Sequence, residues 1–327
     1  MQFTKFGQTG LTVSRMILGT GTFGKQTDEK EAHRMLDKAA EAGINFIDTA
    51  DVYPPGAEVG GAEIVAGRWL SNKRAGFILT KGGGKMGPAA WDAGSSRKHL
   101  LDAIDASLRR LNTDYVDLYQ LHMDDPVTPI DEMVGAMDTI VRSGRARYIG
   151  VSNFLAYRLA KALGRQDTLK LTRFVSAQPR YNLLFREGER ELFPLVQEEG
   201  LAVIPFNPLG GGLLSGKYKH GDTPEKGRFS AELGGFGQAY HARYWHEREF
   251  ETVAKVLEIA KHHGTPITTL SVAWILANPA ITSVILGASR VEQLTDTLAA
   301  ADYKLDNALK TGLDEVSIEF RRGDAGN

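Results

Sequence analysis

Short apolar segments alternate with longer amphipathic segments along most of this chain. The short segments are rich in β-branched residues, and the longer ones carry apolar residues at helical spacing. This alternation favours β–α units and therefore a parallel sheet. We predict eight strands, at residues 14–19, 44–48, 76–81, 116–122, 146–152, 173–178, 201–206 and 282–287.

The periodicity between these strands predicts helices. Asp28 is the expected N-cap of the first helix, since it precedes an apolar face with a 3.6-residue period. The first 13 residues are predicted to form a hairpin that turns at residues 8–10 and closes the bottom of a barrel. Helices are expected at 30–42, 61–70, 97–111, 130–143, 156–163, 189–198, 250–262 and 291–301, and after Asp306.

Eight strands with interleaved helices favour a closed (β/α)8 barrel over an open sheet. Such barrels need roughly 250 residues or more, so this chain of 327 residues fits a single domain. We assign residues 1–320 to the barrel and predict a disordered tail at 321–327. After the seventh strand, a segment rich in Gly, aromatic and charged residues is expected to be a long irregular loop, either a lid or flexible.

Charge balance and cysteine content exclude several classes of protein. With 39 basic and 40 acidic residues, the net charge of −1 gives no electrostatic basis for binding nucleic acid or an anionic membrane surface. No apolar run approaches the ~20 residues of a membrane span. The N-terminus is polar and unlike a signal peptide, so we expect a cytoplasmic protein. The absence of cysteine excludes a thiol nucleophile and cysteine-bound zinc, and we predict no metal site.

Four polar residues stand at or just after the ends of predicted strands. Asp48 ends INFID, Lys81 ends FILTK and His122 ends VDLYQLH, while Tyr53 follows Asp48 by five residues. In a (β/α)8 barrel the C-terminal ends of the strands meet on one face, so these residues converge. A tyrosine hydroxyl has an ordinary pKa of about 10, and a neighbouring ammonium lowers that pKa. The combination predicts general acid catalysis on a carbonyl group.

The segments DTADVY, ILTKGG and DLYQLH resemble the catalytic motifs of the aldo-keto reductases. The resemblance continues in the family's order through RYIGVSNF, VSAQPRYNLL, IPFNPLGGGLLSGKY and LGASRVEQL, and it covers nearly the whole chain. It implies an NADP(H)-dependent reductase of small carbonyl compounds. By resemblance, Tyr53 would protonate the carbonyl oxygen and Lys81 would lower the pKa of Tyr53. Asp48 would pair with Lys81, and His122 would hydrogen-bond the substrate.

The same resemblance implies a set of cofactor contacts. The loop with Thr20 and Gly21, together with Asp48, would border the nicotinamide. Lys217 and Arg228 would bind the 2′-phosphate, since a guanidinium suits a phosphate group. The remaining contacts would be Ser152, Asn153 and Gln178 to the carboxamide, Phe206 stacked on the nicotinamide, Asn207, Pro208, Leu209, Gly211 and Ser215 along the diphosphate, and Gly287, Ser289, Gln293 and Asp296 toward the adenosine.

Two positions depart from the family's pattern. Asp296 and Thr297 stand where Glu-Asn is common, which affects the expected adenine contacts. Gly21 stands where a Trp is frequent, which removes an aromatic wall beside the substrate.

Three short motifs compete with this interpretation. The GTGTFG of residues 19–24 matches the dinucleotide-binding GxGxxG, but GKQTDE follows before any helical periodicity, so a strand-end turn is favoured. Tyr157 and Lys161 have the spacing of the short-chain dehydrogenase pair, yet they lie on a predicted helix. Residues 211–217 resemble a phosphate loop, but Tyr218 replaces the Ser or Thr that would bind Mg²⁺.

Two roles without catalysis remain as alternatives. The barrel also resembles the β subunits of voltage-gated potassium channels, which bind NADPH and act as partners. That lineage carries Asn where His122 stands, so the intact set of four favours an enzyme. A structural role without turnover is the other alternative. Candidate substrates of an enzyme include sugar aldehydes, pyridoxal, dicarbonyls and aromatic aldehydes.

Overall fold

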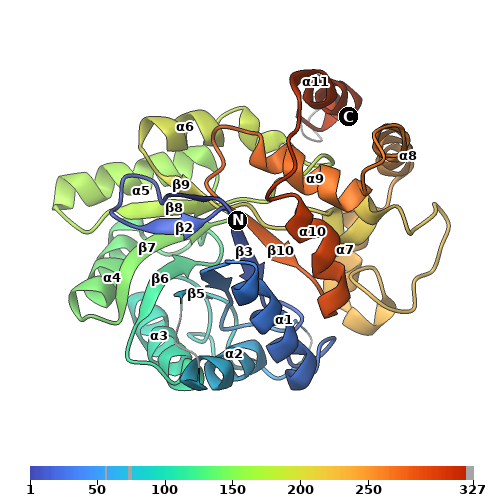
Figure 1. Ribbon diagram of the computed structural model, residues 1–327. Helices are drawn as coiled ribbons and strands as arrows, with labels where there is room; N and C mark the ends of the chain where they lie inside the picture. Colours follow the sequence, from blue (N-terminus) through green and yellow to red (C-terminus); the bar gives the residue numbers. More distant parts are fainter. Residues whose placement is uncertain (56, 73–75, 322–327) are drawn as a thin grey trace.

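Eight strands form one curved parallel sheet with helices on its outside (Figure 1). The computed structural model describes residues 1–55, 57–72 and 76–321. Every predicted strand is confirmed: β3 (Met16–Gly19), β4 (Phe46–Asp48), β5 (Phe77–Gly82), β6 (Val116–Leu121), β7 (Ala146–Ser152), β8 (Phe174–Gln178), β9 (Ala202–Val203) and β10 (Val284–Gly287). Their order in the sheet is β10-β3-β4-β5-β6-β7-β8-β9, and all neighbours run parallel.

Backbone hydrogen bonds close the sheet on itself. The Thr282 N–H donates to the Val203 carbonyl at 2.9 Å, and the Ile285 N–H donates to the Pro205 carbonyl at 3.0 Å. These bonds join the two outermost strands of the order, β9 and β10. The fold is therefore the predicted (β/α)8 barrel.

Side chains of alternate strand residues point to opposite faces of the sheet, which divides the apolar core in two. On β3, Ile17 packs inside the barrel, whereas Met16 and Leu18 pack outward under the helices. On β4, Phe46 points inward and Ile47 outward in the same way. The inward apolar residues fill one end of the barrel. The other end carries the buried polar residues that the site uses.

Most of the helices lie where the sequence predicted them. The N-cap prediction is confirmed, since the Asp28 side chain accepts the N–H of Glu31. The outer helices are α1 (Glu29–Glu41), α2 (Gly61–Asn72), α3 (Arg97–Leu111), α4 (Ile130–Arg142), α5 (Ala156–Leu169), α6 (Leu192–Glu198), α8 (Glu247–His262), α10 (Leu294–Ala299) and α11 (Asn307–Val316). Short 3-10 turns, η1 (Glu187–Glu189) and η4 (Val291–Gln293), form the beginnings of two predicted helices.

Helix α9 (Ile267–Leu276) was not predicted from the sequence. Its sequence, ITTLSVAWIL, has no polar face, because eight of its residues are buried between α8, α10 and the sheet. A helix that is apolar on all sides lacks the amphipathic period by which helices are recognised.

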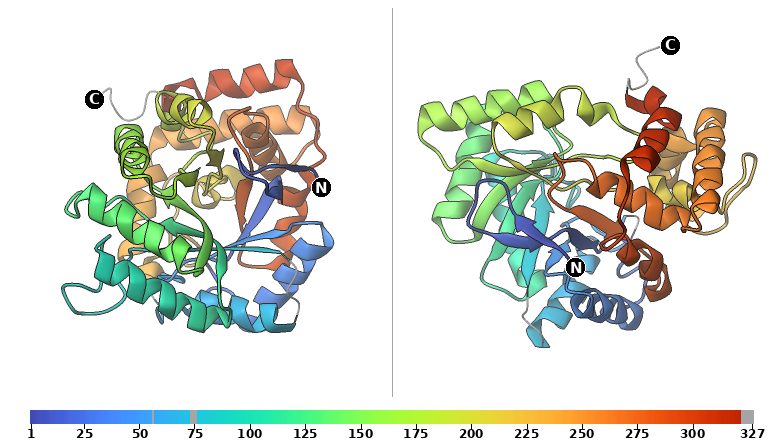
Figure 2. Two further views of the ribbon diagram at one scale, coloured as in Figure 1. Left: turned by 90° about the vertical axis from the view of Figure 1, so that its left-hand side faces the viewer. Right: turned by 45° about the horizontal axis from the view of Figure 1, so that its top comes forward.

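The N-terminal hairpin closes the bottom of the barrel as predicted. β1 (Phe3–Lys5) pairs with β2 (Thr12–Ser14) in antiparallel register. Phe6, in the connecting turn, is 1% exposed and packs edge-on against Phe46 inside the barrel. The hairpin lies in front of the strands in the right-hand view of Figure 2.

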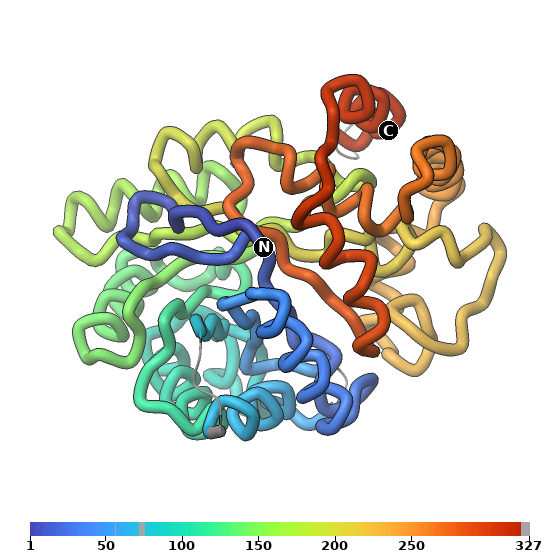
Figure 3. The backbone as a smooth tube through the Cα atoms, viewed as in Figure 1, coloured from blue at the N-terminus to red at the C-terminus, as the bar shows by residue number. Residues whose placement is uncertain are grey.

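The segment after β9 is more ordered than predicted. It contains η2 (Gly210–Ser215), η3 (Ala231–Leu233) and α7 (Gly235–Tyr244), so the expectation of an irregular loop is wrong for much of its length. Part of it, in yellow to light orange, projects from the right-hand side of the backbone trace in Figure 3. Aromatic contacts hold it together: the Phe229 ring lies 5.3 Å from that of Tyr218 and 4.6 Å from that of Trp245. Helix α7 carries little amphipathic pattern, which is why its sequence resembled a loop.

The C-terminal part of the chain begins with α11, predicted after Asp306, which is its N-cap. The 3-10 turn η5 (Ile318–Arg321) follows, so Arg321 belongs to an ordered turn and not to the predicted tail. The rest of that prediction, residues 322–327, lies outside the described residues.

Candidate active site

The four residues singled out in the sequence lie on one face of the barrel, at the C-terminal ends of adjacent strands. Asp48 is the last residue of β4, Lys81 the penultimate residue of β5, and His122 directly follows β6. Tyr53 is in the turn between β4 and α2. Because β4, β5 and β6 are neighbours in the sheet, their ends place these side chains together.

A buried ion pair lies at the centre of the group. The Lys81 Nζ lies 2.8 Å from the Asp48 Oδ1 and also donates to the Thr49 carbonyl at 2.6 Å. Burial lowers the pKa of Lys81, and the Asp48 carboxylate opposes that shift. Gly82 makes room for the neighbouring side chain, since a Cβ there would lie 1.9 Å from the Tyr119 hydroxyl oxygen.

Tyr53 and His122 lie against this ion pair. Their rings meet edge-on with centroids 5.5 Å apart. The Lys81 Nζ lies 5.0 Å from the centroid of the Tyr53 ring. The phenol of Tyr53, the imidazole of His122 and the ammonium of Lys81 thus lie together, as the convergence of the strand ends predicts.

Tyr53 is held in its protonated form. Burial of the phenol raises the pKa of Tyr53, and the negative charge of Asp48 raises it further, while the charge of Arg228 opposes both. That Lys81 lowers this pKa stays a prediction; in the structure the Lys81 ammonium is paired with the Asp48 carboxylate. At neutral pH Tyr53 is therefore a hydrogen-bond donor with a proton to give.

His122 is neutral. Burial and the nearby charge of Lys81 lower its pKa to about 3. Its Nδ1 is buried and forms no hydrogen bond with any described residue. A neutral imidazole can donate a hydrogen bond to a substrate oxygen without competing with Tyr53 as the acid.

Gln178, at the end of β8, ties the group to the next strands. Its Nε2 donates to the Asp48 Oδ1 at 2.8 Å and to the Gln120 Oε1 at 3.1 Å. The Ser152 hydroxyl donates to the Gln178 carbonyl at 2.9 Å, and the Asn153 Nδ2 donates to the His122 carbonyl at 2.9 Å. Ser152, Asn153 and Gln178, predicted from resemblance, thus adjoin the four central residues. Gln120 was not predicted, although it lies on the inward side of β6.

The turn after β9 is built around Asn207. This residue has a φ of 63°, and its Oδ1 accepts the Gly211 N–H at 2.7 Å. The Tyr244 hydroxyl, from α7, accepts hydrogen bonds from the side-chain amides of both Asn207 and Asn182. Asn182 and Tyr244 are therefore positioning residues that the sequence analysis missed. The predicted positions Phe206, Pro208, Leu209 and Ser215 lie in or beside this turn.

The turns after β3 and β10 are joined by hydrogen bonds. Thr22 donates to the Ala288 carbonyl at 2.8 Å, and Thr27 donates to the Ser289 carbonyl at 3.0 Å. The Gln293 side chain accepts the Ser289 N–H at 2.9 Å. The predicted contacts Thr20, Gly21 and Gly287 lie in or next to these turns, and Asp296 lies in the first turn of α10.

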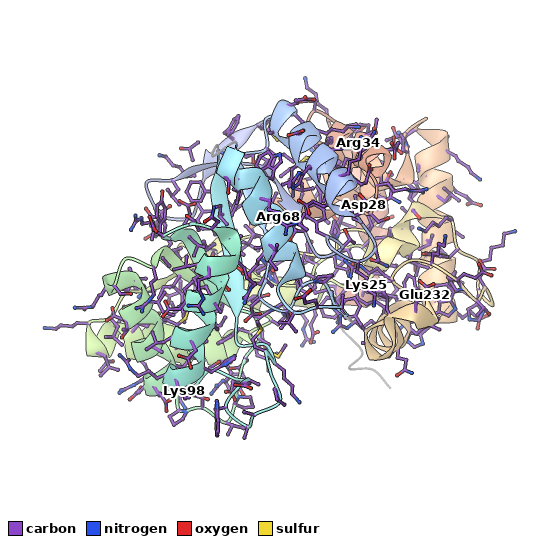
Figure 4. All side chains as sticks on the ribbon, turned by 90° about the horizontal axis from the view of Figure 1, so that it is seen from below. Lys25, Asp28, Arg34, Arg68, Lys98 and Glu232 are labelled. Carbon is purple, nitrogen blue, oxygen red and sulfur yellow. The ribbon has the colours of Figure 1, made fainter. Side chains whose placement is uncertain are left out.

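Two cations outside the catalytic group lie close together. Loss of surrounding water lowers the pKa of Lys217, and the charge of Arg290 lowers it further. The Nη2 of Arg228 would be 3.4 Å from a Cβ on Gly21, beside Tyr53, and its predicted place with Lys217 at the 2′-phosphate stays a prediction. The cation that acts on Lys217 is thus Arg290, which the sequence analysis overlooked although it adjoins Ser289. Figure 4 labels Lys25, in the turn after β3 that contains Gly21, and Glu232, in the segment after β9 that contains Arg228.

The competing short-chain dehydrogenase pair is not part of this site. Tyr157 lies on α5 and is 65% exposed, so it is not in a buried catalytic site. Within the described residues, no group of three or more His, Cys, Asp or Glu side chains could hold a metal ion. Over the same residues, no helix is long and apolar enough to cross a membrane.

Comparison with known proteins points the same way as the motifs. Residues 15–318 match the family model described as the Aldo/keto reductase family. An uncharacterized oxidoreductase of Bacillus subtilis is 36% identical over 97% of this chain and 96% of the relative. A probable voltage-gated potassium channel subunit beta of Arabidopsis thaliana is 36% identical over 92% of both chains. L-glyceraldehyde 3-phosphate reductase of Escherichia coli O157:H7 is 34% identical over 92% of this chain and 87% of the relative.

Proposed function

The chain belongs to the aldo/keto reductase family, a family of oxidoreductases that act on carbonyl groups, and we propose that it reduces an aldehyde or ketone to the alcohol. The hydride donor is NADPH, the reaction is reversible, and Tyr53 gives the proton. The observation that carries this proposal is the buried Lys81–Asp48 ion pair, which lies against a protonated Tyr53 facing a neutral His122.

The residues around the site fit an NADP(H) molecule. Lys217 and Arg290 form no ion pair with any described carboxylate, so both charges are free to meet a phosphate. Two like charges held this close favour an anionic ligand, because such a ligand relieves their repulsion. At the catalytic end, the Thr20 hydroxyl is buried without a partner among the described residues. When bound, the cofactor supplies the hydride, and the protein supplies orientation and electrostatics.

The side chains divide the remaining chemistry among them. Tyr53 and His122 donate hydrogen bonds to the carbonyl oxygen and so polarise the C=O bond. As the carbonyl carbon accepts a hydride, its oxygen becomes basic and takes the proton from the Tyr53 hydroxyl. The phenolate that remains lies next to the Lys81 ammonium, which is held by Asp48. A proton from solvent restores Tyr53 after the alcohol leaves.

A turnover assay tests this proposal. Purified protein is mixed with NADPH and each member of a panel of aldehydes and ketones, and the loss of NADPH absorbance is followed together with the formation of the alcohol. We expect at least one carbonyl compound to be reduced in equal amount to the NADPH consumed. NADPH binding without oxidation across the whole panel would instead support a non-catalytic role.

A further inference from the structure

A buried carboxylate joins α2, α3 and β5 behind the catalytic residues. Glu63, on α2, accepts a hydrogen bond from the Arg110 Nε of α3 at 2.7 Å and another from the Thr80 hydroxyl of β5. Gly60 leaves room for the arginine, since a Cβ there would lie 2.3 Å from the Arg110 Nε. Thr80 precedes Lys81, and successive strand residues point to opposite faces, so Glu63 holds β5 from outside the barrel.

Asp51 lies close to this ion pair but has no partner of its own. Its backbone N–H donates to the Lys81 carbonyl at 3.1 Å, and its Oδ1 would lie 3.4 Å from a Cβ on Gly84. Within the described residues, neither of its carboxyl oxygens has a hydrogen-bond partner. The titratable and charged groups around this carboxyl are Glu63 from α2, Arg110 from α3, His99 of α3 through its bond to the Gly84 carbonyl, Lys81 from β5, Tyr119 from β6 and Tyr53 from the same turn.

The two carboxyl groups share one negative charge. Two neighbouring carboxyl groups that are both buried do not readily ionise together, because their charges repel one another with little water to screen them. Glu63 has an arginine and a hydroxyl as partners, so the charge lies there. Burial, followed by the charge of Glu63, raises the pKa of Asp51 to about 8. Asp51 therefore keeps its proton at neutral pH.

Tyr53 follows Asp51 by two residues in the same turn and responds to its charge. Burial raises the pKa of Tyr53 most, the charge of Asp48 raises it further, and a charge on Asp51 acts in the same direction. The phenolate that forms when Tyr53 gives up its proton is destabilised by a nearby negative charge. Ionised Asp51 would thus make Tyr53 a poorer acid.

We propose that Asp51 is a positioning residue that acts through Tyr53: while it holds its proton it adds no negative charge near the forming phenolate, and its ionisation slows the reduction. This inference rests on the proposed carbonyl reduction and adds an alkaline limit to it. The proton that Tyr53 gives ends on the alcohol, and Asp51 keeps its own. Lys81, whose pKa is lowered by burial, is the competing origin of such a limit.

The pH dependence of a single turnover tests the inference. The enzyme–NADPH complex is mixed with a reducible carbonyl between pH 6 and 9.5, and the rate of NADPH oxidation is followed. The wild-type rate should be level below pH 7 and fall above pH 8. Asp51→Asn is neutral at every pH, so it should match wild type at pH 6.5 and react about ten-fold faster than wild type at pH 9. Glu63→Gln removes the charge that keeps the proton on Asp51, so its rate should begin to fall at a lower pH.

Glu249→Gln is the matched control. Glu249, on α8, is also buried, has one carboxyl oxygen without a partner among the described residues, and has a pKa raised by burial. This variant should keep the wild-type pH profile. Infrared spectroscopy at pH 6.5 gives a readout that needs no turnover: the C=O band of a protonated carboxylic acid should be present in wild type and weaker in Asp51→Asn.

Three outcomes would overturn the inference and leave carbonyl reduction intact. An Asp51→Asn variant whose rate falls above pH 8 as in wild type would assign the limit to Lys81. A wild-type rate that stays level to pH 9.5 would show that no such limit exists. Identical infrared bands in wild type and Asp51→Asn would show that Asp51 is already ionised at pH 6.5. A wild-type enzyme that reduces no carbonyl compound would remove the proposed function, and the inference with it.

Discussion

Asp51 follows Asp48 by three residues but lies in a different environment. It is fully buried. Within the described residues, neither of its carboxylate oxygens accepts a hydrogen bond of ordinary geometry. The Asp51 and Tyr119 oxygens both approach the position that a Cβ of Gly82 would take, at 3.5 and 1.9 Å. Burial, followed by the charge of Glu63, raises the pKa of Asp51 to about 8.

This pKa predicts how stability depends on pH. Between its ordinary pKa near 4 and about 8, Asp51 keeps its proton in the folded protein and loses it in the unfolded chain. The folded state then binds more protons, so its contribution to stability falls as pH rises through this window. Asp51→Asn removes the titration. The variant should therefore gain stability relative to wild type with rising pH, by at most ~1.4 kcal/mol per pH unit.

Urea unfolding of both proteins between pH 5 and 8.5 checks the Asp51 prediction. Glu251→Gln, at an exposed position on α8, is the control for the loss of an acidic side chain. A difference between Asp51→Asn and wild type that stays constant or shrinks with rising pH would show that Asp51 is ionised in the folded protein.

At the scale of the elements, the turns after β9 and β10 are predicted to bind the cofactor's 2′-phosphate. They carry Lys217 and Arg290, respectively. Lys217→Ala combined with Arg290→Ala should weaken NADPH binding by about ten- to hundred-fold, since charge-assisted hydrogen bonds are worth ~1.5–3 kcal/mol. NADH, which lacks the 2′-phosphate, should be affected little. Fluorescence titration of both cofactors measures this difference.

Lys219→Ala is the matched control for these two cations, since Lys219 is exposed two residues beyond Lys217. Equal weakening of NADPH and NADH in the double variant would mean that the residues support the turn and do not contact the phosphate.

The strands and most helices could be predicted because their patterns reflect burial directly. Along the strands, side chains that point into the barrel, such as Ile17 and Phe46, alternate with side chains that point toward the helices, as a sheet with two packed faces requires. Helices α7 and α9 could not be predicted for opposite reasons. Helix α9 is buried on every side, and α7 is rich in Gly and aromatic residues that pack against Phe229 and Arg228. Their partners are set by the tertiary fold, and no local period reports them.

At the scale of the whole molecule, barrel topology is what made the catalytic residues predictable. Asp48, Lys81 and His122 are distant in sequence, but each ends a strand, and parallel neighbours bring strand ends together. The positions of Arg228 and Arg290 were not predictable in this way. Each lies on a turn, and the region that a long side chain reaches depends on how other segments pack. The Arg228 side chain, for example, reaches the space left by the missing side chain of Gly21.

The central claim is that this barrel brings Tyr53 to a carbonyl oxygen as the proton donor. Rapid mixing of the enzyme–NADPH complex with a reducible carbonyl, for wild type and Tyr53→Phe, tests it most directly because one turnover isolates the chemical step. We predict that Tyr53→Phe slows NADPH oxidation by a factor of ~10²–10⁴ while its Kd for NADPH stays close to that of wild type. Oxidation by Tyr53→Phe at the wild-type rate would contradict the assignment of Tyr53 as the acid.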